Sequence, residues 1–188
     1  MTKSFDRVNV PLFVVAILGI GFGVGCASTG QHSIGQIAFL PAGPGTVFDS
    51  VEDAAIDGLA HAYLVSRADG NSGLMYGGTI RPEKAGFTYD PLVSAAPENP
   101  TALRTTLRRT DVARFHVYPR TAVSQVNRRN ERVSRFDRVT VDRRDPVHRP
   151  LFVLTPRLSV MVYRGKALPS TSIASLRPVI SDEQLAGR

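Results

Sequence analysis

The sequence contains no tryptophan, only one cysteine and only three lysines among its 188 residues. A single cysteine excludes an intramolecular disulfide, so cross-links within the chain cannot stabilise the fold. Aromatic residues make up 7% of the chain, but 43% is hydrophobic and 21% is charged, which excludes a fully disordered protein. The 13 prolines and 16 glycines predict short elements joined by many turns.

An almost uncharged run, residues 11–25 (PLFVVAILGIGFGVG), follows a short start that carries Lys3 and Arg7. Its length suits the core of an export signal better than a membrane-spanning helix, which needs about 20 apolar residues. Cys26 comes directly after this run, and residues 23–26 (GVGC) resemble the lipobox of bacterial lipoproteins, with glycine where leucine is usual. The resemblance implies cleavage before Cys26 and a diacylglycerol on its thiol.

The predicted anchor also defines a compartment and an order of segments. Ala27 follows the cysteine, which by resemblance to the enterobacterial sorting rule places the protein in the outer membrane, facing the periplasm. The alternative is an ordinary signal peptide, or an uncleaved anchor, with an incidental cysteine. We predict a signal peptide at 1–25, a lipidated cysteine and tether at 26–46, a folded domain at 47–166 and a C-terminal tail at 167–188.

Positive charge is concentrated between Arg104 and Arg149, where 13 arginines face five acidic residues. This stretch accounts for the whole net charge of +7. A basic surface favours nucleic acid, anionic lipid or an acidic protein, and the export signal argues against nucleic acid. We predict that a surface for an acidic envelope protein or anionic polymer includes Arg128, Arg129, Arg132, Arg135 and Arg138. The alternative is a solvated basic face without a ligand.

The element pattern predicts an α+β domain with one N-terminal helix packed on a mainly antiparallel sheet. Ser50 is a favourable N-cap, Asp53 occupies the capping-box position, and apolar residues at helical spacing continue to about Ser66. Short apolar segments separated by turn residues predict the strands. The predicted strands are 73–80, 85–89, 112–117, 151–154 and 158–163, with a helix near 134–141 and a short helix or edge strand at 102–110.

Two short motifs carry the candidate chemistry. Residues 116–119 (HVYP) lie on a predicted strand, and residues 134–137 (SRFD) follow after fourteen residues. They resemble the H-x-H-P and S-x-x-D motifs of the JAB/MPN zinc peptidases. In that family two histidines on one strand face and the aspartate hold zinc, water takes the fourth position, and an earlier glutamate is the general base.

The order of motifs along the chain is similar to the bacterial JAB-like family of unknown function numbered forty-three twenty-nine. That family has an acidic helix, E-Y-G-G, an aromatic hairpin, the H-x-H strand, S-x-x-D and a closing T-P segment. The corresponding segments here are 50–62, 75–78, 86–89, 116–119, 134–137 and 152–163. The resemblance implies a JAB-like fold over about residues 48–164.

Two positions depart from the metal-binding pattern. Met75 stands where the family has glutamate, and Tyr118 stands at the second histidine. A thioether cannot accept a proton from water, and a neutral phenol with a pKa of about 10 is a poor zinc ligand. His116 and Asp137 remain as candidate metal ligands, and Met75 and Ser134 as degenerate catalytic positions. The alternatives are a core histidine at 116 and a plain helix N-cap at Ser134.

We therefore expect a non-catalytic, membrane-anchored envelope protein that binds another protein, as an accessory of an envelope or secretion system. We expect no cofactor and no nucleic-acid partner, with zinc bound only if the degenerate site still functions. The alternatives are a divergent zinc-dependent peptidase or isopeptidase of the periplasm, and a periplasmic module whose JAB resemblance is accidental. His61 and His148 have no spacing that places them near His116.

Overall fold

The computed structural model describes residues 40–68, 73–121 and 123–176. Cys26, the predicted signal peptide and most of the predicted tether lie outside these residues, as does the end of the predicted tail. All described residues belong to one unit of the chain, residues 35–188. Within the described ranges, no helix is both long enough and apolar enough to span a bilayer.

Helix α1 (Val51–Ala68) begins where the sequence predicts it. The Ser50 hydroxyl accepts a hydrogen bond from the backbone N–H of Asp53 at 3.0 Å and donates to its carboxylate at 2.7 Å. This contact satisfies one of the amides that the first turn of a helix leaves without a partner. The predicted capping interaction at Ser50 is therefore confirmed.

In the described residues one mixed sheet has the strand order β2-β1-β4-β5-β6-β7, and β3 also pairs with β1. Only β4 and β5 are parallel, and every other pair is antiparallel. The α+β class is confirmed, but the sheet is mixed. The strands are β1 (Tyr76–Glu83), β2 (Gly86–Tyr89), β3 (Val93–Ser94), β4 (Ala113–Val117), β5 (Leu151–Leu154), β6 (Ser159–Tyr163) and β7 (Thr171–Ser175).

The parallel pairing of β4 with β5 needs a long crossover, and this connection carries the remaining helices. It contains α2 (Ser124–Arg129), α3 (Arg135–Val139) and the π-helical turn η1 (Thr140–Arg144). The predicted helix near 134–141 corresponds to α3 and the start of η1. Helix α2 escaped prediction because Val126 is its only apolar residue and none of its residues is buried.

Three segments differ most from the predictions, and β1 also begins at Tyr76 instead of residue 73. β1 continues through Pro82, which faces Phe87 on β2. Proline has no N–H to donate, but the N–H and C=O of Phe87 are already hydrogen-bonded to the backbone of Phe48, so no N–H is required at position 82. Residues 102–110 form neither helix nor strand. The predicted tail supplies β7, which pairs with β6, and Leu176, which is buried in the core.

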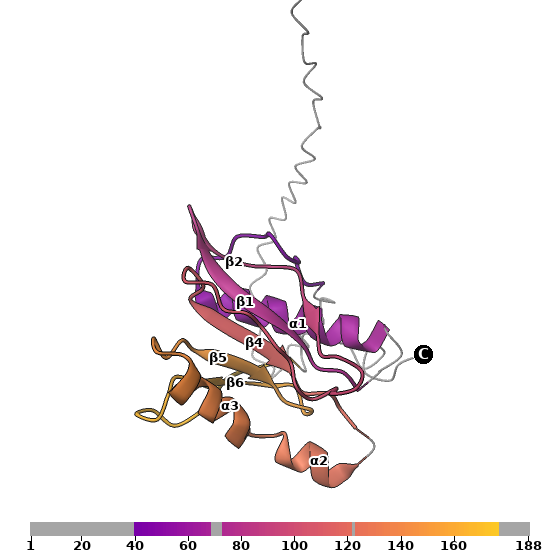
Figure 1. Ribbon diagram of the computed structural model, residues 1–188. Coiled ribbons are helices and arrows are strands. Elements are labelled where there is room, and N and C mark those ends of the chain that lie inside the picture. Colours follow the sequence, from indigo (N-terminus) through magenta and orange to yellow (C-terminus); the bar gives the residue numbers. More distant parts are fainter. Residues whose placement is uncertain (1–39, 69–72, 122, 177–188) are drawn as a thin grey trace, which may run out of the picture. The chain divides into compact units, whose positions relative to one another are not determined.

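Side chains that alternate along β4 face two separate apolar clusters. Phe115 and Val117 belong to the cluster that includes α1, and a Cβ on Gly58 of α1 would lie 2.7 Å from the Phe115 ring. His116 points to the other face, where Val133 and the other members of the second cluster lie. Figure 1 shows α1 beside β1 and β4, with α3 near β5 and β6. The sheet is therefore covered on both faces.

The last residues of the predicted tether are part of the folded unit. The Asp57 carboxylate on α1, only 2% exposed, accepts hydrogen bonds from the N–H groups of Ala42 at 2.8 Å and Gly43 at 3.1 Å. It also accepts the Tyr89 hydroxyl at 2.7 Å. A buried carboxylate needs such donors, so it holds this segment against α1. The last residues of the predicted 26–46 segment therefore pack against α1.

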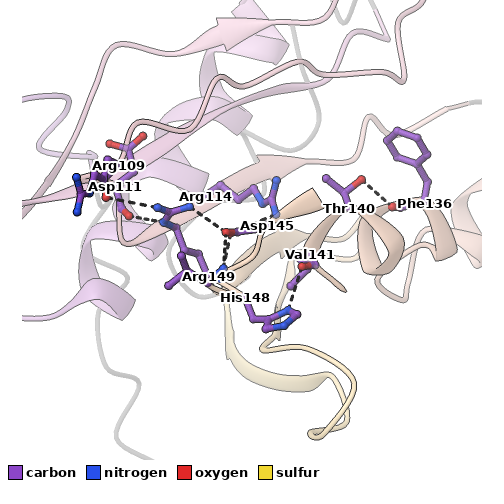
Figure 2. A network of polar contacts seen from close by, with 10 residues as sticks. Arg109, Asp111, Arg114, Phe136, Thr140, Val141, Asp145, His148 and Arg149 are labelled. Carbon is purple, nitrogen blue, oxygen red and sulfur yellow. Dashed lines mark hydrogen bonds and ion pairs between the residues drawn. The ribbon is translucent and has the colours of Figure 1, made fainter. Parts of the chain in front are cut away.

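A buried ionic network closes the start of the parallel pair (Figure 2). The Asp145 carboxylate accepts hydrogen bonds from the backbone of Val147 and from the backbone and guanidinium of Arg149, and Arg114 Nη2 lies 3.7 Å away. Arg149 Nε donates to the Asp111 carbonyl at 2.6 Å. Burial lowers the pKa of Arg114 although Asp145 opposes this shift. Asp145 thus interacts with Arg114 on β4, before the crossover, and with Arg149, just before β5.

Replacing this carboxylate should destabilise the fold strongly. Asp145→Asn removes the main charge that opposes buried Arg114 and leaves only the weaker attraction of Asp137, so we expect the free energy of unfolding to fall by about 3–5 kcal/mol. Urea unfolding measures the change. Asp142→Asn is the matched control: its half-buried carboxylate accepts the Tyr163 hydroxyl at 2.9 Å, and its loss should cost about 1 kcal/mol. Equal losses in the two variants would contradict this role for Asp145.

Candidate functional site

Four residues of the two motifs meet on the face of the sheet opposite α1. His116 lies on β4, and Tyr118 is the first residue after this strand. Ser134 and Asp137 belong to the start of α3. His116 Nε2 is 3.6 Å from Asp137 Oδ2, and the rings of His116 and Tyr118 are 5.1 Å apart between centroids. Opposite His116 the neighbouring strand carries Gly77, where a Cβ would lie 2.1 Å from a backbone oxygen. The structure thus brings together residues that the sequence separates.

The Asp137 carboxylate is the centre of this cluster. Ser134 is the N-cap of α3: its hydroxyl accepts a hydrogen bond from the Asp137 N–H at 3.1 Å and donates to Oδ2 at 2.6 Å. The Tyr118 hydroxyl also donates to Asp137 Oδ2 and accepts the Ser134 N–H at 2.9 Å. The S-x-x-D motif is therefore a helix cap that is hydrogen-bonded to Tyr118, the residue after β4.

These contacts set the charge of the cluster. Burial raises the pKa of Asp137, but the attraction of His116 and the hydrogen bonds from Ser134 and Tyr118 outweigh it, so the pKa lies well below its usual range. Burial and the neighbouring Asp137 charge raise the pKa of Tyr118 above 10. The carboxylate is therefore ionised and the phenol neutral at physiological pH. His116 Nε2 is buried and has no hydrogen-bond partner.

A cavity of about 430 Å³ opens beside Asp137. Buried Met75 lines it, at the position where the family resemblance places the catalytic glutamate. Val126 of α2 and Phe136 of α3 also line it and are 36% and 58% exposed. The wall of the cavity is thus largely apolar, and two of its apolar side chains are accessible to a partner.

The donor set does not fit the three-ligand zinc site that the resemblance implies. Only His116 and Asp137 offer zinc ligands, because the neutral Tyr118 phenol is already hydrogen-bonded to Asp137 and Ser134. Across the described ranges, no group of three or more His, Cys, Asp or Glu side chains could hold a metal. His61 contacts Tyr89 in the core on the α1 side, and His148 contacts the Val141 carbonyl, so neither completes the set.

The five arginines of the predicted partner surface lie on α2, on α3 and on the loop between them. All five are exposed, and Arg129 lines the cavity beside Asp137. Sequence reasoning missed Val126, and it missed Thr101 and Ala102, which reach the cavity from a loop without regular structure. No local pattern marks these residues, because only the folded chain places them beside β4 and α3.

Comparisons with protein-family models, with curated proteins and with solved structures find no match for this chain.

The ionised Asp137 predicts a specific loss of stability in acid. Its pKa is lower in the folded chain than the unfolded value of about 3.9, so its contribution is complete above that pH and is lost as the pH falls below it. Urea unfolding at pH 6 and at pH 2.5 measures this loss. Asp137→Asn should show a smaller fall than the unaltered protein, whereas exposed Glu98→Gln should not differ from it. Identical falls in all three would contradict the role of Asp137.

Proposed function

We propose that this chain is a lipid-anchored protein of the bacterial envelope whose JAB-like domain has lost catalysis and binds another protein. The observation that carries this proposal is the state of Asp137. Its carboxylate is hydrogen-bonded to Tyr118 and Ser134 of the same chain, instead of being free to hold a metal. The cluster therefore works as a structural support for the cavity beside it.

The JAB-like part of the proposal is supported by the order of the motifs and by their convergence. Met75, Tyr118, Ser134 and Asp137 line one cavity, and His116 lies 3.6 Å from Asp137. Residues from three separate motifs would not be expected to meet in this way if each resemblance were accidental. The order of the elements supports the same interpretation: helix α1 comes first, the β1–β2 hairpin follows, and the strand that carries His116 comes after both.

The chemistry of the cluster favours binding over hydrolysis. Hydrolysis by the JAB mechanism needs a general base for water and a metal that makes this water acidic. Met75 offers no base, and two ligands are too few for a tight zinc site. We therefore propose that neither zinc nor another cofactor is needed for function.

The surface around the cavity supports an acidic protein segment as the partner. Phe136 and Val126 expose apolar surface, which gives a partner side chain a place to be buried. Exposed Arg129 lies on the cavity wall, and Arg132 and Arg135 follow on the same crossover. Guanidinium groups bind carboxylates through paired hydrogen bonds. An apolar side chain flanked by acidic residues would complement both features.

Membrane attachment is proposed from the sequence. Cys26 lies outside the described residues, and the support is its place directly after an apolar export signal, in a GVGC sequence that resembles a lipobox. Acyl chains on this residue would anchor the protein stably, since each buried methylene contributes about 0.8 kcal/mol. The following Ala27 supports the outer membrane, with the domain in the periplasm.

A divergent zinc peptidase is the second candidate, and one distance favours it. Two ligands that are each about 2.0–2.1 Å from a tetrahedral zinc ion lie roughly 3.3 Å apart. His116 Nε2 and Asp137 Oδ2 are 3.6 Å apart, and Nε2 has no hydrogen-bond partner. The metal content of the protein separates this candidate from the first.

Zinc analysis should show little metal in the unaltered protein. After incubation with one equivalent of zinc and gel filtration, we expect far less than one zinc per chain, because only two ligands are present. Tyr118→His supplies a third ligand and should retain about one zinc, and His116→Ala in that variant should abolish it. Stoichiometric zinc in the unaltered protein that disappears in His116→Ala would support the peptidase instead. A Tyr118→His variant without zinc would contradict the JAB-like placement.

Photo-crosslinking in cells should identify the binding surface. A photoreactive phenylalanine analogue at position 136 should yield one discrete crosslinked product, because this side chain is at the mouth of the cavity. The same group at exposed Lys84, on the turn between β1 and β2, is the matched control and should give none. Equal crosslinking at the two positions, or none at position 136, would contradict a protein-binding role for this cavity.

The anchor is tested by labelling cells with radioactive palmitate. The unaltered protein should incorporate label and sediment with membranes, and Cys26→Ser should lose the label and the membrane association. Ser28→Ala, two residues away, controls for general effects on export. Label that persists in Cys26→Ser, or a protein without any label, would exclude lipidation at this residue.

A further inference from the structure

A second cavity, of about 310 Å³, lies between α2 and the turn that joins β5 to β6. It shares no lining residue with the cavity beside Asp137. Its lining is mostly polar and includes guanidinium groups from three separate segments of the chain. The lining residues are Arg120, Ser124, Asn127, Arg128, Glu131, Pro156 and Arg157.

The cavity carries more positive charge than the chain neutralises. Arg157 Nε is 4.0 Å from Glu131 Oε1, the limit for an ion pair, and no hydrogen bond joins them. Arg120 and Arg128 have no carboxylate partner in the described parts of the chain. Three guanidinium groups and one carboxylate leave an excess of two positive charges. An anion between these groups would relieve their mutual repulsion.

The segments that carry these arginines are held in place without a ligand. The Asn127 side chain accepts the Thr121 N–H at 3.0 Å and donates to the Thr121 carbonyl at 2.7 Å, which fixes the chain after Arg120 against α2. On the other side, Thr155 closes the turn that contains Arg157: its hydroxyl accepts the Ser159 N–H at 3.2 Å, and its own N–H donates to the Ser159 carbonyl at 3.0 Å. Because the backbone of these segments is already held, less entropy is lost when a ligand binds than if the segments also had to be ordered.

We propose that this cavity binds a phosphate group. A phosphate monoester carries a charge of about −1.5 to −2 at pH 7, which matches the excess of two positive charges. A carboxylate carries half that charge. Phosphate also accepts paired hydrogen bonds from guanidinium groups on several sides, and the exposed Ser124 hydroxyl adds a neutral donor.

The same chemistry could come from a lipid headgroup or from a soluble phosphate ester. A lipid such as phosphatidic acid and a soluble ester such as glycerol 3-phosphate both present a phosphate monoester, and the cavity of about 310 Å³ is open to either. The site is independent of the protein-binding cavity, so its test does not depend on the proposed function.

Calorimetric titration of the full chain in neutral detergent micelles tests the site. Inorganic phosphate should bind saturably, with one ion per chain, and several-fold more tightly than acetate. Arg120→Ala combined with Arg128→Ala should weaken binding roughly tenfold or more, because hydrogen bonds to charged groups are lost. Arg109→Ala combined with Arg143→Ala is the matched control. It removes the same charge at exposed positions outside the cavity and should leave binding nearly unchanged.

Two further ligands distinguish the sources of the phosphate. Phosphatidic acid mixed into the micelles and free glycerol 3-phosphate are compared at equal phosphate concentration. Tighter binding of phosphatidic acid assigns the site to a lipid headgroup, and equal or tighter binding of glycerol 3-phosphate assigns it to a soluble ester. Absence of saturable phosphate binding, an equal affinity for acetate, or an equal loss in the control variant would overturn the proposal.

Discussion

A buried carboxylate must be surrounded by donors, and this requirement organises the candidate site around Asp137. The side chain is 10% exposed, and its Oδ2 accepts hydrogen bonds from the Ser134 and Tyr118 hydroxyls. Because Ser134 is also the N-cap of α3, the same contacts hold the start of this helix against the end of β4. Removing either hydroxyl would leave the charge with fewer donors and the helix less firmly attached. The position of the neighbouring cavity therefore depends on a single ionised group.

In the JAB-like domain that we propose, the Tyr118 phenol stands where the zinc peptidases have an imidazole. A neutral imidazole presents a lone pair to a metal, whereas the Tyr118 phenol donates its proton to Asp137 and remains neutral. The polar groups are then satisfied by one another, and Met75 makes the adjoining wall apolar. Under the proposed function, positions that serve hydrolysis in a zinc peptidase serve here to shape a cavity.

Helix α2 separates two cavities of opposite character. One is lined by apolar side chains beside Asp137, and the other by arginines beside the β5–β6 turn. None of the residues of α2 is buried, and its exposed side chains line a cavity on each side. In a protein tethered to a membrane, these two cavities would allow contact with a protein and with a phosphate group at the same time.

Local signals in the sequence determined the elements that depend on neighbours along the chain. The Ser50 cap predicted the start of α1, and alternation predicted β4, because capping and strand periodicity involve residues a few positions apart. The parallel β4–β5 pair, β7 and the position of Arg157 beside Arg128 were decided by tertiary structure. These contacts join residues far apart in the chain, and their free energy comes from burial and charge balance in the folded state, which leaves no local pattern in the sequence.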